Sequence, residues 1–319
     1  MSRKVQSRPL THRFTFHGDG ASFFGIHLVT MFLSAVTLGI YSFWGRVKIR
    51  RYLYSQMEFA GERFAYHGTG MELLKGWARA SFLLGAVLGL NSLLFFLWDD
   101  PASAWITQLI PLAMVVMLAP LAVVGTLRYR FTRTSWQGIR FSFRGRALDF
   151  AKVFVPAAFL NLVTLGLYFP FFLAKILPYI AANTAYGNER FAFDGKGRDL
   201  FSQTLLAAIL TPLTLGIYGF WYQAHVERFV WDHMSVAGAR FRSTVSGGGL
   251  FVLGITNGLL MLVTLGLAYP WVKVRDLRYK LAHLTLVGNV DWTQIRQEAH
   301  EAGTFGEGMA DVLDLELGV

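Results

Sequence analysis

The sequence contains no cysteine, which excludes disulfide bonds, thiolate catalysis and cysteine-based metal sites. Charged residues are also scarce: they make up 16% of the chain, whereas about 25% is usual in a soluble domain. Six stretches hold no Asp, Glu, Lys or Arg, namely 20–45, 80–98, 101–127, 153–174, 200–226 and 243–272. Each is long enough for the helix of about 20 residues that crosses a bilayer. The sequence therefore predicts an integral membrane protein, because a soluble fold does not explain six such stretches.

The residue sets that carry catalysis are missing as well. The eight histidines form no His-Glu-x-x-His motif and no pair four residues apart with a third ligand. Because the six apolar stretches contain no acid, a proton-coupled pump with an Asp or Glu relay at depth is disfavoured. We expect no catalytic residue, no metal and no cofactor, and we do not expect an enzyme.

The net charge of +10 lies outside the apolar stretches. No nucleic-acid-reading module accompanies this charge, so a nucleic-acid partner is not expected. In a membrane protein, excess Lys and Arg set topology and attract anionic headgroups. The expected partners are therefore anionic membrane lipids.

An internal repeat organises the chain. An Arg-Phe-x-Phe segment begins at Arg13, Arg140 and Arg190, Arg63 begins the variant Arg-Phe-x-Tyr, and a degraded copy begins at Arg240. The intervals are 50, 77, 50 and 50 residues, so the second of five units carries 27 extra residues. The predicted divisions are a basic tail at 1–12, units at 13–62, 63–139, 140–189, 190–239 and 240–291, and an acidic tail at 292–319.

A second motif closes the apolar run of every unit except the second. This Thr-Leu-Gly motif is followed by aromatic residues, which collect at the headgroup level of a bilayer. The motif residues are Thr37, Gly39, Thr164, Gly166, Thr214, Gly216, Thr264 and Gly266.

A segment that is usually basic follows each motif and is too charged to cross a bilayer. Such a segment suits a helix that lies in the interface, where Lys and Arg bind phosphates. The candidate lipid-phosphate contacts are Lys48, Arg50, Arg51, Arg128, Arg130, Lys273, Arg275 and Arg278.

These patterns predict an all-α polytopic membrane protein with about six transmembrane helices, and residues 169–187 are an alternative seventh. The positive-inside rule places both flanks of the extra helix pair in the cytoplasm and its Asp99-Asp100 tip outside. The orientation of the other units is not consistent with this rule. If each unit crossed once, successive units would alternate in orientation, yet most of their second segments are basic. The alternative is that the Thr-Leu-Gly runs dip into the membrane and return. Six full crossings are the preferred prediction.

Four polar residues within the apolar stretches are candidate intramembrane sites: His27, Asn91, Asn161 and Asn257. Ionisable residues at depth are functional candidates, and amides can line a polar path. They can equally make hydrogen bonds between neighbouring helices, which is the favoured interpretation for His27. The three amides occupy unequal places in their units, which weakens the idea of a shared path.

The repeated motifs resemble the YjgN family of bacterial inner-membrane proteins. The resemblance rests on Phe14-x-Phe16-x-Gly18, the run from Val36 to Tyr52, and Gly61-x-x-Phe64-x-Tyr66-x-Gly68, and the ending near Asp311 is also similar. It implies a polytopic protein of the inner membrane with no assigned function, and it transfers no catalytic residue. The chain departs from the pattern in its second unit and at Pro178 and Glu227, where the first unit has basic residues.

Two functions remain open at this point. The preferred hypothesis is a non-enzymatic scaffold that contacts anionic lipid through its basic interfacial helices and binds another inner-membrane protein or a second copy of itself. The alternative is a transporter or lipid-handling conduit built from repeats. An enzyme that acts on lipid is the least favoured class.

Overall fold

The computed structural model describes residues 10–97 and 101–297, and within α4 it does not describe the side chains of 101–115 and 117. The predicted basic tail, the acidic tail beyond 297 and the Asp99-Asp100 tip lie largely or wholly outside this part of the chain. The order strand, helix, helix, short strand recurs five times. Ten strands result: β1 Thr11–Phe16, β2 Met57–Phe59, β3 Glu62–Tyr66, β4 Thr134–Trp136, β5 Ile139–Phe143, β6 Thr184–Tyr186, β7 Glu189–Phe193, β8 Met234–Val236, β9 Ala239–Ser243 and β10 Leu284–Val287.

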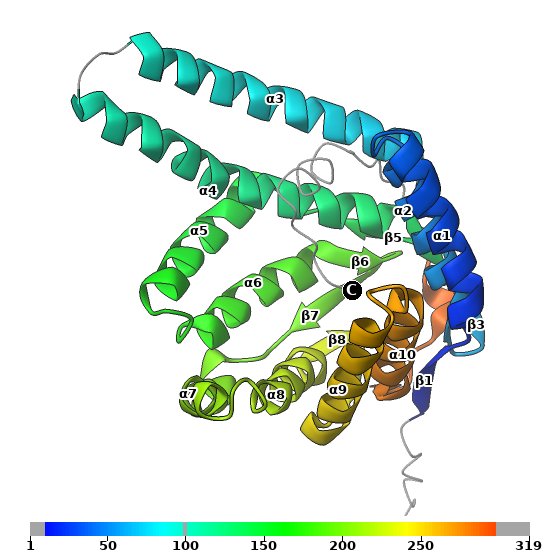
Figure 1. Cartoon of the computed structure of the whole chain (residues 1–319). Helices are drawn as coiled ribbons and strands as arrows, with labels where there is room; N and C mark the ends of the chain where they lie inside the picture. The colour runs from blue at the N-terminus through cyan, green and yellow to red at the C-terminus, as the bar shows by residue number, and fades with distance from the viewer. Residues whose placement is uncertain (1–9, 98–100, 298–319) are drawn as a thin grey trace, which may run out of the picture.

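The helices form five antiparallel pairs, one in each unit (Figure 1). In the following, the first helix of a pair is called the apolar helix and the second the return helix. The pairs are α1 Gly20–Val36 with α2 Ser42–Gln56, α3 Gly70–Leu97 with α4 Pro101–Thr132, α5 Ala147–Val163 with α6 Phe169–Asn183, α7 Gly197–Leu213 with α8 Gly219–Asp232, and α9 Gly247–Val263 with α10 Tyr269–Ala282. Each helix contacts the next along the chain, and α10 contacts α1, so the helices also form a closed ring.

The ten strands close into one antiparallel barrel in the order β1-β10-β9-β8-β7-β6-β5-β4-β3-β2. The first and last strands pair directly, with Thr11 opposite Val287. This barrel shows that the predicted all-α fold is wrong. The alternation of Arg-Phe-x-Phe does mark the longer strands, but their partners, such as Met57–Phe59, have only three residues and leave no periodic pattern.

All helix pairs leave the barrel from the same rim. In an alternating antiparallel barrel, the ends of the odd-numbered strands and the starts of the even-numbered strands share one rim. Every apolar helix follows an odd-numbered strand, and every return helix precedes an even-numbered one. The prediction of six crossings with alternating orientation is therefore wrong. Among the described residues, one helix, Gly70–Leu97, is long and apolar enough to cross a membrane.

Aromatic side chains fill the barrel. One phenylalanine of each unit contributes to this packing: Phe14, Phe64, Phe141, Phe191 and Phe241. Neighbouring rings in this set lie close together, with centroids 6.3 Å apart for Phe64 and Phe141 and 6.4 Å apart for Phe191 and Phe241. Inward residues alternate with outward ones along a strand, which explains why the arginine before each phenylalanine is exposed.

The segment after β10 covers the rim opposite the helices. The Trp292 ring lies 4.9 Å from that of Trp136 and 5.6 Å from that of Phe59. The backbone N–H of Arg296 donates to the side chain of Asn188 in the turn between β6 and β7. The barrel is thus closed by packed side chains along its interior and by this segment at one rim.

Candidate functional site

The tips of four helix pairs share one unusual turn. The leucine of each Thr-Leu-Gly motif is almost fully exposed: Leu38 by 94%, Leu165 by 93%, Leu215 by 94% and Leu265 by 92%. All four have φ near +50°, and the glycine that follows each has φ near +90°. Each turn therefore presents an apolar side chain outward at the point furthest along the chain from the barrel.

The threonine of the motif holds this turn together. The Thr214 hydroxyl donates to the Leu210 carbonyl at 2.7 Å and accepts from the Tyr218 N–H at 2.9 Å. Thr37, Thr164 and Thr264 make the equivalent pair of hydrogen bonds. The motif residues are thus structural, and the residue that they present is the leucine between them.

A leucine in this conformation is costly. The left-handed region brings a Cβ close to the carbonyl oxygen and costs roughly 1–2 kcal/mol for a residue other than glycine, whereas Asn and Gly tolerate it more easily. The same cost recurs at four tips with the same side chain. The leucines touch little of the protein, so packing of their side chains does not offset this strain, and the hydrogen bonds of the turn hold the conformation.

The predicted phosphate-contacting residues divide into two groups. Three arginines link neighbouring units through the backbone: Arg51 donates to the Gly68 carbonyl, Arg128 to that of Gly145 and Arg278 to that of Gly18. The last bond joins the fifth unit to the first. These arginines therefore have a structural role that the sequence analysis did not foresee.

The other predicted cations lie along the return helices. Lys48 donates to the Tyr41 hydroxyl at 2.7 Å, Arg50 reaches the Tyr66 hydroxyl at 3.4 Å, and Arg275 donates to Thr256 at 2.9 Å. Arg130 on α4 and Lys273 on α10 are half-buried. The predicted cations lie on three return helices, α2, α4 and α10. Both α2 and α10 contact α1, so the cations of these two helices flank the same apolar helix.

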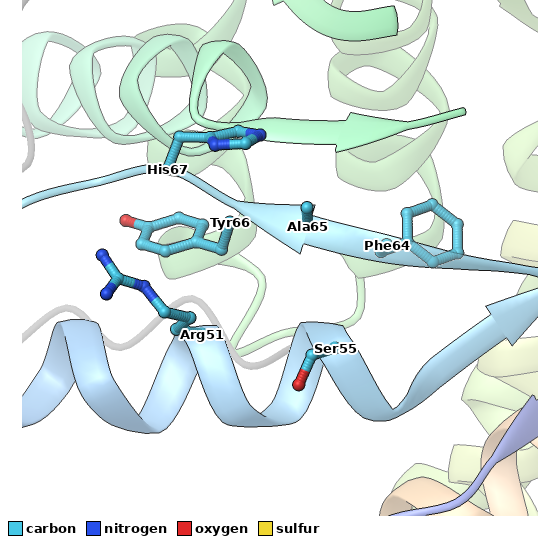
Figure 2. A pocket seen from close by; sticks show the side chains of 6 residues that line it. All are labelled: Arg51, Ser55, Phe64, Ala65, Tyr66 and His67. Carbon is cyan, nitrogen blue, oxygen red and sulfur yellow. The ribbon is translucent and has the colours of Figure 1, made fainter. Parts of the chain in front are cut away.

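A hollow of about 370 Å³ lies between α2 and β3. Figure 2 shows Arg51 and Ser55 on the helix, with the guanidinium of Arg51 directed toward the end of the strand that carries Tyr66 and His67. His67 makes a 2.8 Å hydrogen bond with the Ser135 hydroxyl. Burial, followed by the positive charges of Arg140, Arg51 and Arg133, lowers the pKa of His67 below its usual value. The hollow is therefore a region of positive potential.

The sequence analysis assigned no role to His67 or to the tyrosine that recurs near the end of every unit except the fourth, where Phe229 stands. The Tyr52 hydroxyl bonds the backbone of Asp19, and that of Tyr179 bonds the backbone of Arg146, 33 residues earlier in both cases. The regular recurrence of this tyrosine along the chain was the signal that could have found the contact. For His67 the sequence carried no signal, because its basic neighbours come from three separate segments.

The four intramembrane polar candidates do not meet. They lie on four different apolar helices, α1, α3, α5 and α9. Among the described residues, no hydrogen-bond partner is found for Nδ1 of His27 or for the side-chain oxygens of Asn91, Asn161 and Asn257. No cluster of three or more His, Cys, Asp or Glu able to hold a metal is found in the described part of the chain.

Comparison with known proteins places the chain in a family. The sequence model of a family described as "Bacterial protein of unknown function (DUF898)" matches residues 11–219 and 203–312. The chain is 38% identical over 133 residues to inner membrane protein YjgN of Escherichia coli O157:H7, covering 42% of this chain and 31% of that protein. It is 34% identical over 171 residues to YjgN of Escherichia coli K12, covering 53% and 40% respectively. The chain thus spans well under half the length of these relatives.

The YjgN protein of Salmonella typhimurium is similar at 32% identity over 133 residues, covering 42% of this chain and 31% of that protein. No solved structure matches the chain. The names of the relatives support a location in the bacterial inner membrane, as the sequence predicted. The chain belongs to this family of bacterial proteins of unknown function, DUF898, and the predicted resemblance to YjgN inner-membrane proteins is confirmed.

Proposed function

We propose that this protein is a scaffold of the inner membrane that inserts its helix pairs into the bilayer from one side and contacts anionic headgroups through its return helices. The observation that carries this proposal is the set of four exposed, strained leucines at equivalent tips. A bilayer supplies the apolar surroundings that these side chains lack within the protein.

The apolar surface of the short helix pairs matches one leaflet. The exposed apolar residues of α7 and its tip run from Phe201 to Leu215, a distance of about 21 Å at 1.5 Å per residue. On α5 the exposed Lys152 precedes Leu165 by about 20 Å of helix. The hydrocarbon core is about 30 Å thick, so these tips reach roughly its middle.

The second unit is long enough to pass through. Its apolar helix α3 has 28 residues, and the segment after Arg79 spans about 27 Å of helix up to Leu97. That distance matches the whole hydrocarbon core. We therefore propose that α3 and α4 cross the membrane where the other pairs turn back. The Asp99-Asp100 tip, outside the described residues, would then reach the far side.

The cations of the return helices fit the headgroup level. Lys48, Lys175 and Arg275 each follow a tip leucine by ten residues. Lys48 lies 5.5 Å from the ring centroid of Tyr41, and Lys175 lies 5.6 Å from that of Tyr168. Amphipathic rings and long basic side chains of this kind occupy the interface between hydrocarbon and water.

The alternative of a conduit has less support. A path along the barrel axis would meet the phenylalanines of the interior and then Trp292. The amides that could have lined a path, Asn91, Asn161 and Asn257, are spread over helices that are not neighbours in the ring. The arrangement is that of a filled core with exposed interfacial surfaces, which favours the scaffold.

Single-cysteine labelling tests the proposal, because the natural chain has no cysteine to interfere. A cysteine replaces Leu38, Leu165, Leu215 or Leu265, and a control cysteine replaces the exposed Ala192 on β7. Each is labelled with an environment-sensitive fluorophore in liposomes that contain nitroxide-labelled lipid. We expect quenching by mid-chain nitroxides at all four tips and none at position 192.

Two results would contradict the proposal. Tips that remain in water would show that the leucines do not enter the bilayer. Tips that report opposite leaflets in alternation would show that the pairs do not insert from one side.

A further inference from the structure

The hollow beside His67 continues into a second one toward the tip of the first unit. The second hollow, of about 280 Å³, is lined by Ile26 of α1 and by Lys48 and Tyr52 of α2. Both hollows share Arg51 and Ser55. Together they form a trough along α2, with His67 and Tyr66 at its barrel end, Arg51 and Ser55 common to both parts, and Ile26, Tyr52 and the cation Lys48 at its tip end.

We propose that this trough binds one anionic glycerophospholipid, whose phosphate is held by Arg51 and His67 and whose acyl chain lies beside Ile26. This inference rests on the proposed insertion of the helix pairs, because that insertion brings the tip end of the trough into the hydrocarbon. It goes further by assigning a defined site to one lipid molecule.

The charges around the barrel end favour a phosphate. Arg51 and Arg140 both act on His67, and Arg133 acts on it from the turn between α4 and β4. The nearby acid, Glu72, is already engaged by Arg133 at 2.6 Å and by the Tyr129 hydroxyl at 3.1 Å. The lowered pKa of His67 favours its neutral ring, so the positive charge that attracts an anion comes from Arg51, and His67 can add only a ring N–H donor. Arg51 is exposed, and its guanidinium can keep its single bond to the Gly68 carbonyl while other N–H groups bind a phosphate.

The shape favours a lipid over a free anion. A phosphate alone would fill only the end near His67 and leave the space beside Ile26 and Tyr52 empty. Beyond Ile26, the apolar helix continues with the exposed side chains of Leu28, Val29 and Phe32. An acyl chain that leaves the trough thus passes directly onto an apolar surface.

The third unit offers a natural contrast. At the positions of Arg51 and His67 it has Pro178 and Asp194, although Lys175 replaces Lys48. Asp194 makes an ion pair with Arg240. The equivalent trough there lacks both groups that hold the phosphate, so we do not expect this site in the third unit.

Native mass spectrometry of the full chain released from nanodiscs tests this site. Nanodiscs contain phosphatidylcholine with increasing phosphatidylglycerol, and a separate arm adds inorganic phosphate to phosphatidylcholine nanodiscs. We expect one phosphatidylglycerol to remain bound to the wild type. The double variant Arg51→Gln, His67→Gln should lose it with at least a tenfold weaker apparent affinity. The control variant Arg190→Gln, at an exposed arginine of the barrel, should retain it.

Because Arg51 also links two units, Lys48→Gln provides a second variant that leaves this link intact, and we expect an intermediate loss. Unchanged retention in both variants would overturn the site. Equal effects of inorganic phosphate and lipid would show an anion site without lipid selectivity and would also overturn it. If the tip fluorophores are still quenched in the double variant, membrane insertion stands and only this inference fails.

Discussion

The two ends of each unit differ in how far their apolar side chains are buried. At the barrel end, side chains such as Trp136 and Phe241 pack inward on one another. At the tip end, a leucine such as Leu215 points away from the protein altogether. Both ends contain backbone turns with positive φ, at Gln137 as well as at Leu215. One end is thus organised by its own core, and on the proposed insertion the other end is surrounded by the bilayer.

Replacement of all four tip leucines with asparagine should have the largest effect on the difference between the two ends. Burial of a leucine contributes about 1.5–3 kcal/mol, so the four together lose about 6–12 kcal/mol of membrane insertion energy. A fluorophore on a cysteine at Ile209, exposed on α7, should then move from the hydrocarbon into water.

The same change should leave the fold intact in detergent or make it slightly more stable, because asparagine tolerates the left-handed region better than leucine. Circular dichroism and thermal unfolding measure this second effect. Continued quenching at position 209, or a clear loss of stability, would show that the leucines serve the fold and not the membrane.

At the barrel end, Trp136→Ala should lower the stability of the fold, which the leucine replacements leave intact. Trp136 is 2% exposed, and its indole N–H donates to the carbonyls of Phe59 and Glu62 at 3.2 Å. Replacement of a buried tryptophan by alanine costs about 3–5 kcal/mol of unfolding free energy. Denaturant unfolding in detergent measures the loss, and Arg190→Ala at the exposed barrel surface is the matched control. A loss below 1 kcal/mol would contradict the packed interior.

A smaller effect should follow from Thr214→Val, which keeps the shape of the side chain and removes both hydrogen bonds of the turn. A hydrogen bond contributes about 0.5–1.5 kcal/mol, so we expect the two to cost about 1–3 kcal/mol of unfolding free energy. The fluorophore at position 209 should remain in the hydrocarbon, since Leu215 is unchanged. Withdrawal of the tip would mean that the turn, and not the leucine, controls insertion.

The smallest effect concerns pH. Burial and the charges of Arg140, Arg51 and Arg133 lower the pKa of His67 in the folded protein, while its ring bonds Ser135. The unfolded chain therefore takes up a proton first as the pH falls. The contribution of His67 to stability is complete above about pH 6.5 and declines as the pH falls through that value toward its lower folded pKa. Subtraction of the pH profile of His67→Gln isolates this contribution, and identical profiles would contradict it.

The sequence indicated the spacing of the units and the ends of the short apolar helices better than it indicated the barrel. Spacing of the arginines from Arg13 to Arg240 marked the places where the element order restarts, and Thr-Leu-Gly marked the end of each short apolar helix. Membrane character and family also followed from the residues. The barrel did not, because strands of three residues such as Thr184–Tyr186 carry no periodic signal and pair with segments far along the chain.

The predicted membrane topology was wrong for a related reason. An apolar run of about 20 residues satisfies the length of a crossing, but the run 20–45 is broken at Leu38 and Gly39 into two helices. For the candidate site, the basic positions lay on the predicted helices. The bonds of Arg51 and Arg278 to glycine carbonyls were not predictable, since Gly18 and Arg278 meet only when the ring is closed.

The pairing of β1 with β10 has a consequence for the synthesis of the chain. The partners of Thr11–Phe16 include Leu284–Val287, so the barrel stays open until nearly the whole sequence has left the ribosome. During that time the growing arc carries two unpaired strand edges, which can pair with another chain. Closure between segments so distant in sequence is slow by its topology. On the proposed insertion, early helix pairs that enter the membrane would hold β1 near the place where β10 emerges, which would favour closure within one chain.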